Sequence, residues 1–453
     1  MLGGAAALGC SDSTGPGSGS GATAATLVLT FATPPSDSLG QRTVAFSVAR
    51  SDSARLSRVQ FYVDSGAGST AQDAVSSVVE PAYGSMPAAV WRATALLPGP
   101  GRHTITVVGV DTAGRALGAS AAWTVRIPTE AYILSALPDS GAGGEAFFVH
   151  ANGTVAGSVV SADGRERAAL WRNGALSILA LPDSFHGAAK RVNAAGDVLL
   201  DGGRFPSAPW SPGSTWASVL RADGTLLPIG PTSACCTVAA DLTETRLALG
   251  SLNVPYQGQA PNPPYATLVL DVARGVRVDS MTGSFVALNT AGQALGAQSD
   301  AVTGDYSNVT LIRRGFTSAP APDGGISCDL YGRYTIVEPI DLDESADVLA
   351  AYCGTGFVWL PPAGGTGRWL YPVLGPSQAV HLSRTGGVVA SLDPTGAIYL
   401  WRPATNRVTQ VQVASGAWKI DALASVNASG QIAAHGVETA TGRKAALLLT
   451  PAP

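Results

Sequence analysis

The densest cluster of potential metal ligands in the chain is the acidic run Asp341-Leu342-Asp343-Glu344-Ser345-Ala346-Asp347. Carboxylates two residues apart suit a hard cation such as Ca²⁺, which binds about six to eight oxygen ligands. The run lacks the ligand spacing and the glycine of an EF-hand loop. It also falls on a turn of an internal repeat, where other copies carry Asn, Gly and Asp for conformational reasons. We therefore expect no metal, and keep Asp341, Asp343 and Asp347 as a weak candidate site.

The 5 histidines are scattered along the chain. His150 takes the turn position that Asn193 and Asn427 take in other copies of the repeat, while His381 and His435 flank expected inner strands. We interpret them as turn and strand residues with satisfied hydrogen bonds; the alternative is that some of them face a central channel. No catalytic residue and no cofactor are predicted, because the chain has no Gly-x-Ser-x-Gly, P-loop or GxGxxG motif. Paired carboxylates from distant segments, as in glycoside hydrolases, remain open.

Four of the cysteines suggest disulfides and an oxidising compartment. Cys328 and Cys353 can close one loop across adjacent strands. Cys235 and Cys236 are adjacent, so they form either a strained vicinal disulfide or two buried thiols. The chain has no Cys-x-x-Cys and no His-x-x-x-His, which leaves a zinc site without support.

The composition predicts many short strands joined by tight turns. Of the 453 residues 46% are hydrophobic and 13% charged, and 54 Gly and 30 Pro interrupt the apolar runs. No apolar stretch reaches the roughly 18 to 20 residues that a membrane-spanning helix needs. The net charge of −4 gives no attraction to nucleic acid or to anionic lipid, so we expect no nucleic-acid partner.

A sevenfold internal repeat fills residues 131–453. Its clearest copies are Val192–Val198 and Val426–Ile432, in which an apolar residue precedes a polar turn containing Gly and an apolar strand follows. We place the turn glycine or its equivalent at Gly153, Gly196, Thr245, Gly292, Ala346, Gly386 and Gly430. The spacing averages about 46 residues, the length of a four-stranded propeller blade.

Two further patterns belong to the repeat. Trp171, Trp359 and Trp401 end an expected outer strand after the turn, and we expect them to pack between blades. The segment Tyr132–Asp139 matches Leu176–Asp183, down to a shared Leu-Pro-Asp, whereas the last copy stops after its Leu-rich strand. The strand at 131–138 therefore completes the last blade and closes the ring, which favours seven blades over six or eight.

Residues 24–127 have the strand density of an Ig-type sandwich. Period-two alternation appears in Val44-Phe46-Val48 and in Val59-Phe61-Val63, and about seven strands fit into about 100 residues. The segment resembles the Ig-like domains of bacterial surface proteins, without a Cys pair. We interpret His103 and Asp111 as turn and strand-edge residues.

Residues 1–23 resemble a truncated signal followed by a flexible tether. Ala7-Leu8-Gly9-Cys10 is similar to the lipobox of bacterial lipoproteins, which implies lipidation of Cys10. The Ser/Gly/Thr-rich stretch up to Thr23 has the composition of a flexible linker.

The repeat copies resemble the HAF-type extracellular repeats of bacterial surface proteins, most strongly at 145–200 and 378–448. The resemblance implies a secreted or surface-attached propeller and carries no catalytic motif. The predicted fold is all-β, an Ig-like β-sandwich at 24–127 followed by a seven-bladed β-propeller at 128–453. The predicted protein is a monomeric, lipid-anchored or secreted, non-enzymatic binding or scaffold protein of the cell envelope with a carbohydrate or protein ligand. The alternative is an envelope hydrolase or lyase with its site at the channel mouth.

Overall fold

In the computed structural model the regular secondary structure of the described residues is nearly all β-strand, which confirms the all-β prediction. The structure describes residues 29–453 except for the segments 34–42, 51–57, 65–89, 98–100, 111–115, 120–122, 183–184, 205–214, 231–236, 253–265, 283, 300–308, 315–336, 353–355, 361–367, 376 and 414–415. Two compact units make up the chain. The first holds residues 1–129 and 406–408, and the second holds residues 130–405 and 409–453. No helix in the described residues is long and apolar enough to cross a membrane.

The first unit contains two antiparallel sheets. One sheet has the order β1 (Leu29–Thr33), β2 (Thr43–Arg50), β4 (Val90–Leu96). The other is built around β5 (Gly101–Val110), which pairs with β3 (Arg58–Val63), β6 (Ala116–Ala119) and β7 (Trp123–Ile127).

The core of the second sheet of this unit includes Phe61 and Ile105, which have no exposed surface. His103 is also buried, inside β5, and its Nδ1 lies 2.6 Å from Asp64 Oδ2. The expectation of a turn or strand-edge residue at this position is therefore wrong, because a carboxylate partner lets the imidazole lie in the interior. Asp111 lies outside the described residues.

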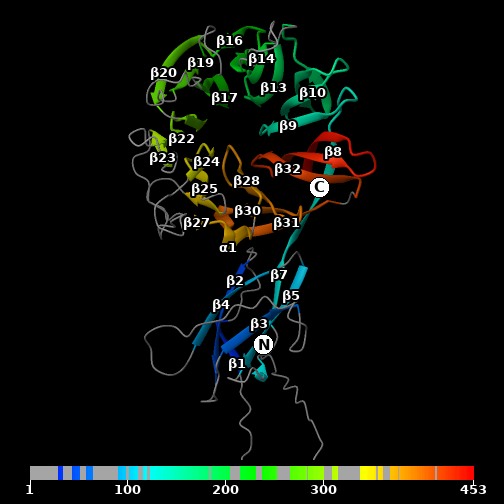
Figure 1. Cartoon of the computed structure of the whole chain (residues 1–453), viewed down its shortest axis with the longest axis vertical. Coiled ribbons are helices and arrows are strands. Elements are labelled where there is room, and N and C mark those ends of the chain that lie inside the picture. Colours follow the sequence, from blue (N-terminus) through cyan, green and yellow to red (C-terminus); the bar gives the residue numbers. More distant parts are fainter. Residues whose placement is uncertain are drawn as a thin grey trace, which may run out of the picture. The chain divides into compact units, whose positions relative to one another are not determined.

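The second unit is a ring of antiparallel sheets, the architecture of a β-propeller (Figure 1). Five of its sheets are separate, and in each the strands follow one another in chain order. The first sheet has β9 (Gly144–Val149), β10 (Val155–Val160), β11 (Glu166–Arg172) and β12 (Ala175–Ile178), and the second has β13 (Phe185–Val192), β14 (Val198–Arg204), β15 (Thr215–Leu220) and β16 (Leu226–Pro228). The third has β17 (Thr237–Leu242), β18 (Leu247–Leu252), β19 (Ala266–Asp271) and β20 (Val276–Thr282), the fourth has β21 (Ser284–Leu288), β22 (Ala294–Ser299) and β23 (Val309–Arg314), and the fifth has β24 (Val337–Leu342), β25 (Val348–Tyr352), β26 (Gly356–Leu360) and β27 (Arg368–Trp369). A short helix, α1 (Tyr371–Leu374), follows β27.

The ring also contains one eight-stranded sheet that joins the last part of the chain to the first strand of the second unit. Its order is β28 (Ala379–Leu382), β29 (Val389–Leu392), β30 (Ile398–Arg402), β31 (Arg407–Val413), β8 (Thr129–Ala136), β34 (Lys444–Pro451), β33 (Ile432–Glu438) and β32 (Trp418–Val426). β8 pairs antiparallel with β34, with Tyr132 opposite Pro451 and Ala136 opposite Leu447. The Tyr132 hydroxyl donates to the Gly430 carbonyl at 2.9 Å.

A recurring turn links the innermost strand of each sheet to the next strand. In the described residues it starts at His150, Asn193, Thr243, Asn289, Asp343, Ser383 and Asn427. In each turn the fourth residue donates its N–H to the carbonyl of the first and has a positive φ, from 66° to 83°. This fourth residue is Gly in five copies, Ala346 in one and Arg246 in one. The expected position Thr245 is therefore wrong by one residue, because the third copy has no glycine to mark it.

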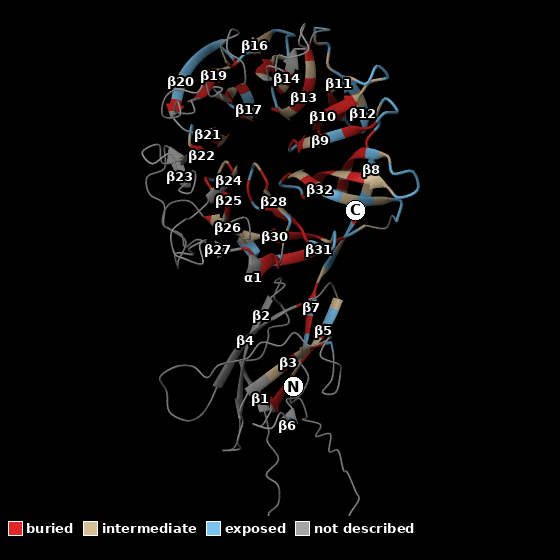
Figure 2. Cartoon of the chain, in the orientation of Figure 1, coloured by how far each residue is buried: buried red, intermediate tan, exposed pale blue. Residues whose placement is uncertain are grey.

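Apolar clusters fill the spaces between neighbouring sheets. Trp171 on β11 packs in a cluster with Ala433 and Ala446 of the adjoining sheet, and its Nε1 donates to the Pro138 carbonyl at 2.7 Å. The Trp359 and Trp401 rings of two further sheets meet edge to face at 5.4 Å. The tryptophans thus lie between sheets, but on the third strand of the sheet rather than on an outer strand. Figure 2 shows buried residues in the middle strands and exposed residues on outermost strands such as β20.

The left-handed turn position predicts a measurable asymmetry between two glycines. Gly292 has φ +76° and Gly416 does not have a left-handed φ, while a Cβ added at either site would meet nothing within 4 Å. We expect Gly292→Ala to lower the free energy of unfolding by about 1–2 kcal/mol, the cost of left-handed backbone for an L-residue. Gly416→Ala is the matched control and should cost nothing, because it restricts only the unfolded chain. Urea unfolding measures both, and equal effects would contradict the backbone argument.

Candidate functional site

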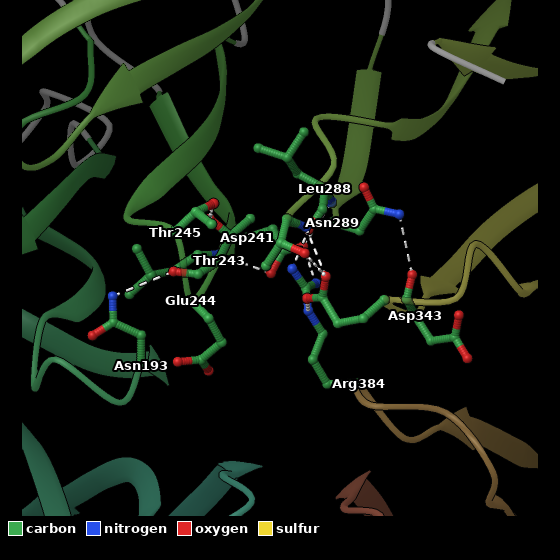
Figure 3. A network of polar contacts seen from close by, with 12 residues as sticks. Asn193, Asp241, Thr243, Glu244, Thr245, Leu288, Asn289, Asp343 and Arg384 are labelled. Carbon is green, nitrogen blue, oxygen red and sulfur yellow. Dashed lines mark hydrogen bonds and ion pairs between the residues drawn. The ribbon is translucent and has the colours of Figure 1, made fainter.

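The seven turns form a polar collar at one end of the ring. Asn193, Asn289 and Asn427 are buried, and each sends its Nδ2 across to a carbonyl of the next turn at 3.0–3.3 Å. Figure 3 shows two of these bonds, to Thr243 and Asp343. The side-chain oxygen of each Asn meanwhile accepts from the backbone of its own turn. The Asn of the repeat therefore shapes one turn and ties it to the next.

Glu244 adds a second tie across the collar. Its Oε2 accepts from the Ala194 N–H at 2.7 Å, and its Oε1 lies 3.0 Å from His150 Nε2. The hydrogen bond with Glu244 raises the pKa of His150 although burial opposes the change. His150 is thus a partnered turn residue, as the sequence predicts.

Glu344 has the same place in a later turn. It accepts from both the N–H and the hydroxyl of Thr290, at 2.7 and 2.6 Å. Its other oxygen lies 2.7 Å from Arg384 Nε, so the side chain links three successive turns.

Asp241, on β17, is a fully buried charge between two arginines. It has no exposed surface and lies 2.9 Å from Arg191 Nε. Its other oxygen lies 2.6 Å from Arg384 Nη1 (Figure 3). It also accepts the N–H groups of Leu242 and Leu288 at 2.8 and 2.7 Å. Burial alone would raise the pKa of Asp241, but the two guanidinium groups hold it below its ordinary value.

A cavity of about 210 Å³ lies at the centre of the ring, beside this cluster. Its walls come from the innermost strands β9, β13, β17, β24, β28 and β32 and from the turn after β28. The polar side chains in the wall are Lys190, Arg191, Asp341, His381, Arg384 and Ser425. These residues belong to different sheets, so only the folded ring brings them together.

His381 and Asp341 are neighbours in the cavity wall. His381 Nδ1 lies 3.6 Å from Asp341 Oδ2, and its Nε2 lies 3.1 Å from the Leu423 carbonyl. Because a carbonyl only accepts, Nε2 must carry a proton. Asp341 in turn accepts the Leu382 N–H at 3.1 Å. His435 lies outside the cavity lining, with Nε2 2.6 Å from the Ala146 carbonyl.

Lys190 differs from the other cations of the wall. Its ammonium lies 3.5 Å above the centre of the Phe147 ring. Within the part of the chain that the structure describes, no carboxylate forms an ion pair with it. Arg191 and Arg384, by contrast, are each bound to carboxylates.

The weak metal candidate Asp341, Asp343 and Asp347 does not form one site. Asp341 faces the cavity, whereas Asp343 Oδ1 accepts the Ser345 and Asp347 N–H groups inside its own turn. Among the described residues no group of three His, Cys, Asp or Glu side chains has the arrangement of a metal site. Cys10, Cys235, Cys236, Cys328 and Cys353 all lie outside the described residues.

Asp343 stands where other turns have Asn, and the difference leaves a polar atom unpaired. Its Oδ2 occupies the place of the amide nitrogen and has no hydrogen-bond partner in the described structure. A Cβ added to Gly386 would lie 2.7 Å from this oxygen, which shows that it faces the next turn. Burial, followed by the charge of Asp347, raises the pKa of Asp343 to about 7.

Lys190, Arg191, Asp241 and Arg384 are not predicted from the sequence. Arg191, Asp241, Asp341 and His381 all stand two residues before the first residue of a turn. Once the turns are aligned, this register is visible in the sequence, but the pairing across sheets is not.

Comparisons with known proteins show no family for this chain. No family model matches the chain, and no curated protein matches it. Solved structures resembling it include an oligogalacturonate lyase in complex with manganese (TM-score 0.45, 10% identity, 72% of this chain and 99% of that one). An oligogalacturonate lyase from Vibrio parahaemolyticus has a TM-score of 0.43 and 9% identity, over 71% of this chain and 98% of that one. The WD40 repeats of RRP9 have a TM-score of 0.43 and 10% identity, over 72% of this chain and 99% of that one. Likenesses this distant assign neither activity nor ligand to this chain.

Asp343 predicts a pH dependence of stability. A carboxyl whose pKa rises from 3.8 to about 7 on folding favours the folded state when protonated, so its contribution is present at low pH and lost as the pH rises from about 4 to about 7. Asp343→Asn supplies the missing donor and should raise stability at pH 8 by about 1–3 kcal/mol, the cost of an unsatisfied buried group. The stability of this variant should depend less on pH than that of the wild type. The dependence that remains comes from Asp347, whose pKa burial raises to about 6.

Denaturant unfolding between pH 4 and pH 8 measures this difference. Asp421→Asn, at an exposed position of β32, is the control and should leave the profile unchanged. Identical profiles for the wild type and Asp343→Asn would contradict the assignment of a protonated carboxyl.

Proposed function

We propose that the second unit is a non-enzymatic binding module whose ligand, a carbohydrate or a protein segment, occupies the central cavity. One observation carries the proposal: the ionisable groups suited to acid–base chemistry around the cavity are engaged in bonds between strands. Asp241 is buried between two arginines, and Asp341 accepts a backbone N–H. A general acid or base must reach the proton that it transfers. These carboxylates instead serve the scaffold.

An envelope hydrolase or lyase is the second candidate, and the pair His381 and Asp341 favours it. An imidazole 3.6 Å from a carboxylate resembles a general base with its orienting partner. Against this role, Nε2 of His381 donates to a backbone carbonyl, so only Nδ1, which lies beside Asp341, is left to take a proton from a substrate.

The wider architecture that we propose is a seven-bladed propeller of the HAF-repeat type carried on an Ig-like spacer. Seven recurring turns support the blade count, if the eight-stranded sheet is counted as two blades that meet at β31 and β8. The hydrogen bonds between β8 and β34 support closure by the strand near residue 132. Two sheets at residues 29–127 support the spacer. A monomer, and disulfides at Cys328–Cys353 and Cys235–Cys236, complete the proposal.

A ligand screen on the full chain tests the binding function. We expect selective binding on a glycan array or a peptide array without chemical change of the ligand. Ala240→Trp places an indole in the cavity wall and should weaken binding at least tenfold, because the space is lost. Ala428→Trp, at an exposed turn residue outside the lining, is the matched control and should bind as the wild type does.

Two outcomes would overturn the binding function. Equal binding by Ala240→Trp and Ala428→Trp would move the ligand away from the cavity. Product release that disappears in His381→Ala would favour the hydrolase or lyase instead.

We also propose lipid anchoring at Cys10. In a bacterial host, Cys10→Ala should move the protein from the membrane fraction to the soluble fraction, because a thioether to diacylglycerol needs the cysteine sulfur. Fractionation followed by immunoblotting measures the shift, with Cys353→Ala as the control. An unchanged distribution of Cys10→Ala would contradict the anchor.

A further inference from the structure

A β-bulge recurs in the innermost strands. Six of these strands carry an extra residue three positions before the first residue of the turn. Four of the six extra residues line the cavity. The extra residues are Phe147, Lys190, Ala240, Val286, Ile340 and Ala424. A bulge redirects its side chain without altering the rest of the ladder. Five of the six are apolar, so the repeat itself does not require a charge at this position, and Lys190 is the exception.

Lys190 is a cation of the cavity wall with no carboxylate within ion-pair distance among the described residues. Arg191 is neutralised by Asp241 at 2.9 Å and Arg384 by Asp241 and Glu344 at 2.6 and 2.7 Å. Lys190 is partly buried in the wall, and its ammonium lies 3.5 Å from the centre of the Phe147 ring. Asp201 is close enough to interact with it electrostatically, without an ion pair. An anion bound in the cavity would gain an attractive interaction with an ammonium that no described carboxylate pairs.

Asp201, on β14, does not supply the missing charge. Burial raises its pKa above the ordinary value for an aspartate, although the charge of Lys190 acts against the rise. No ion pair between the two is found among the described residues. Asp201 therefore does not occupy the hydrogen-bond donors of the ammonium.

The cavity volume limits the ligand. About 210 Å³ is below the roughly 300 Å³ at which pockets for drug-sized molecules begin. It suits a single sugar residue, and the wall offers both charged groups and the aromatic ring of Phe147.

We propose that the cavity recognises a carboxylate-bearing ligand of about one sugar residue in size, with the Lys190 ammonium as the counter-ion. This inference rests on the proposed binding function and names its ligand class. The bulge positions the ammonium in the wall, Phe147 supports it from one side, and the ligand carboxylate approaches from the other.

Ligand-observed NMR titration of the full chain tests the inference with three probes of equal ring size: glucuronate, glucose and glucosamine. We expect glucuronate to bind at least tenfold more tightly than the other two, with an affinity that falls as salt is added. Lys190→Met keeps most of the aliphatic part of the side chain and should weaken the binding of glucuronate at least tenfold. Lys190→Arg should retain binding, and Lys444→Met, at an exposed position of β34, is the matched control.

The alternatives give distinct results. Equal binding of glucose and glucuronate, or equal affinities in the wild type and Lys190→Met, would overturn the carboxylate inference while leaving the cavity as a binding site. Absence of glucuronate binding to the wild type would overturn it too, and the array screen with Ala240→Trp would then decide the binding function separately. Because the probe comparison uses the wild-type chain, it holds even if Lys190→Met fails to fold.

Discussion

The pairing of β8 with β34 joins the two ends of the second unit, and the rest of the ring depends on it. Five residue pairs connect the strands, and the Tyr132 hydroxyl extends the junction to the Gly430 carbonyl. Burial raises the pKa of Tyr132 above the usual range, so the phenol stays protonated and can donate at any physiological pH. A sheet of four short strands leaves both faces apolar and must be covered by neighbours. Closing the ring gives every sheet two neighbours and leaves no terminal sheet exposed.

Closure also explains why the channel tolerates so much charge. Asp241 is paired with Arg191 from a preceding sheet and Arg384 from a sheet further along the ring. A buried carboxylate costs several kcal/mol unless its charge and its lone pairs are satisfied, so a ring opened at one junction would leave these groups uncompensated. The collar and the β8 junction are therefore interdependent, because each supplies partners only when the other is in place.

The sequence predicts the residues that recur in every copy of the repeat. It does not predict which side chains from different sheets meet at the cavity. The all-β class and five of the seven turn positions follow from Gly and Asn, since left-handed backbone restricts the residue choice. The turn at Ala346 follows only from the spacing of the repeat. The turn position of the third copy is predicted one residue too early, at Thr245. Arg246 adopts the positive φ there without being a glycine, so no residue type in the sequence marks the position. The role of Lys190 could not be predicted for a different reason. A bulge is defined by the pairing register between two strands, and no single-residue signal marks it.

The division between repeating and unique residues has a physical basis that bears on function. Asn193, Asn289 and Asn427 recur because each must satisfy a carbonyl of the next turn, so a ligand could displace them only by breaking the collar. The bulge residues are not constrained in this way. Lys190 and Ala240 occupy equivalent positions on adjacent sheets, although one is charged and the other apolar. Positions that the scaffold leaves unconstrained are those at which binding chemistry can be introduced without loss of the fold. The channel face of the bulges is therefore where ligand specificity can vary while the ring is preserved.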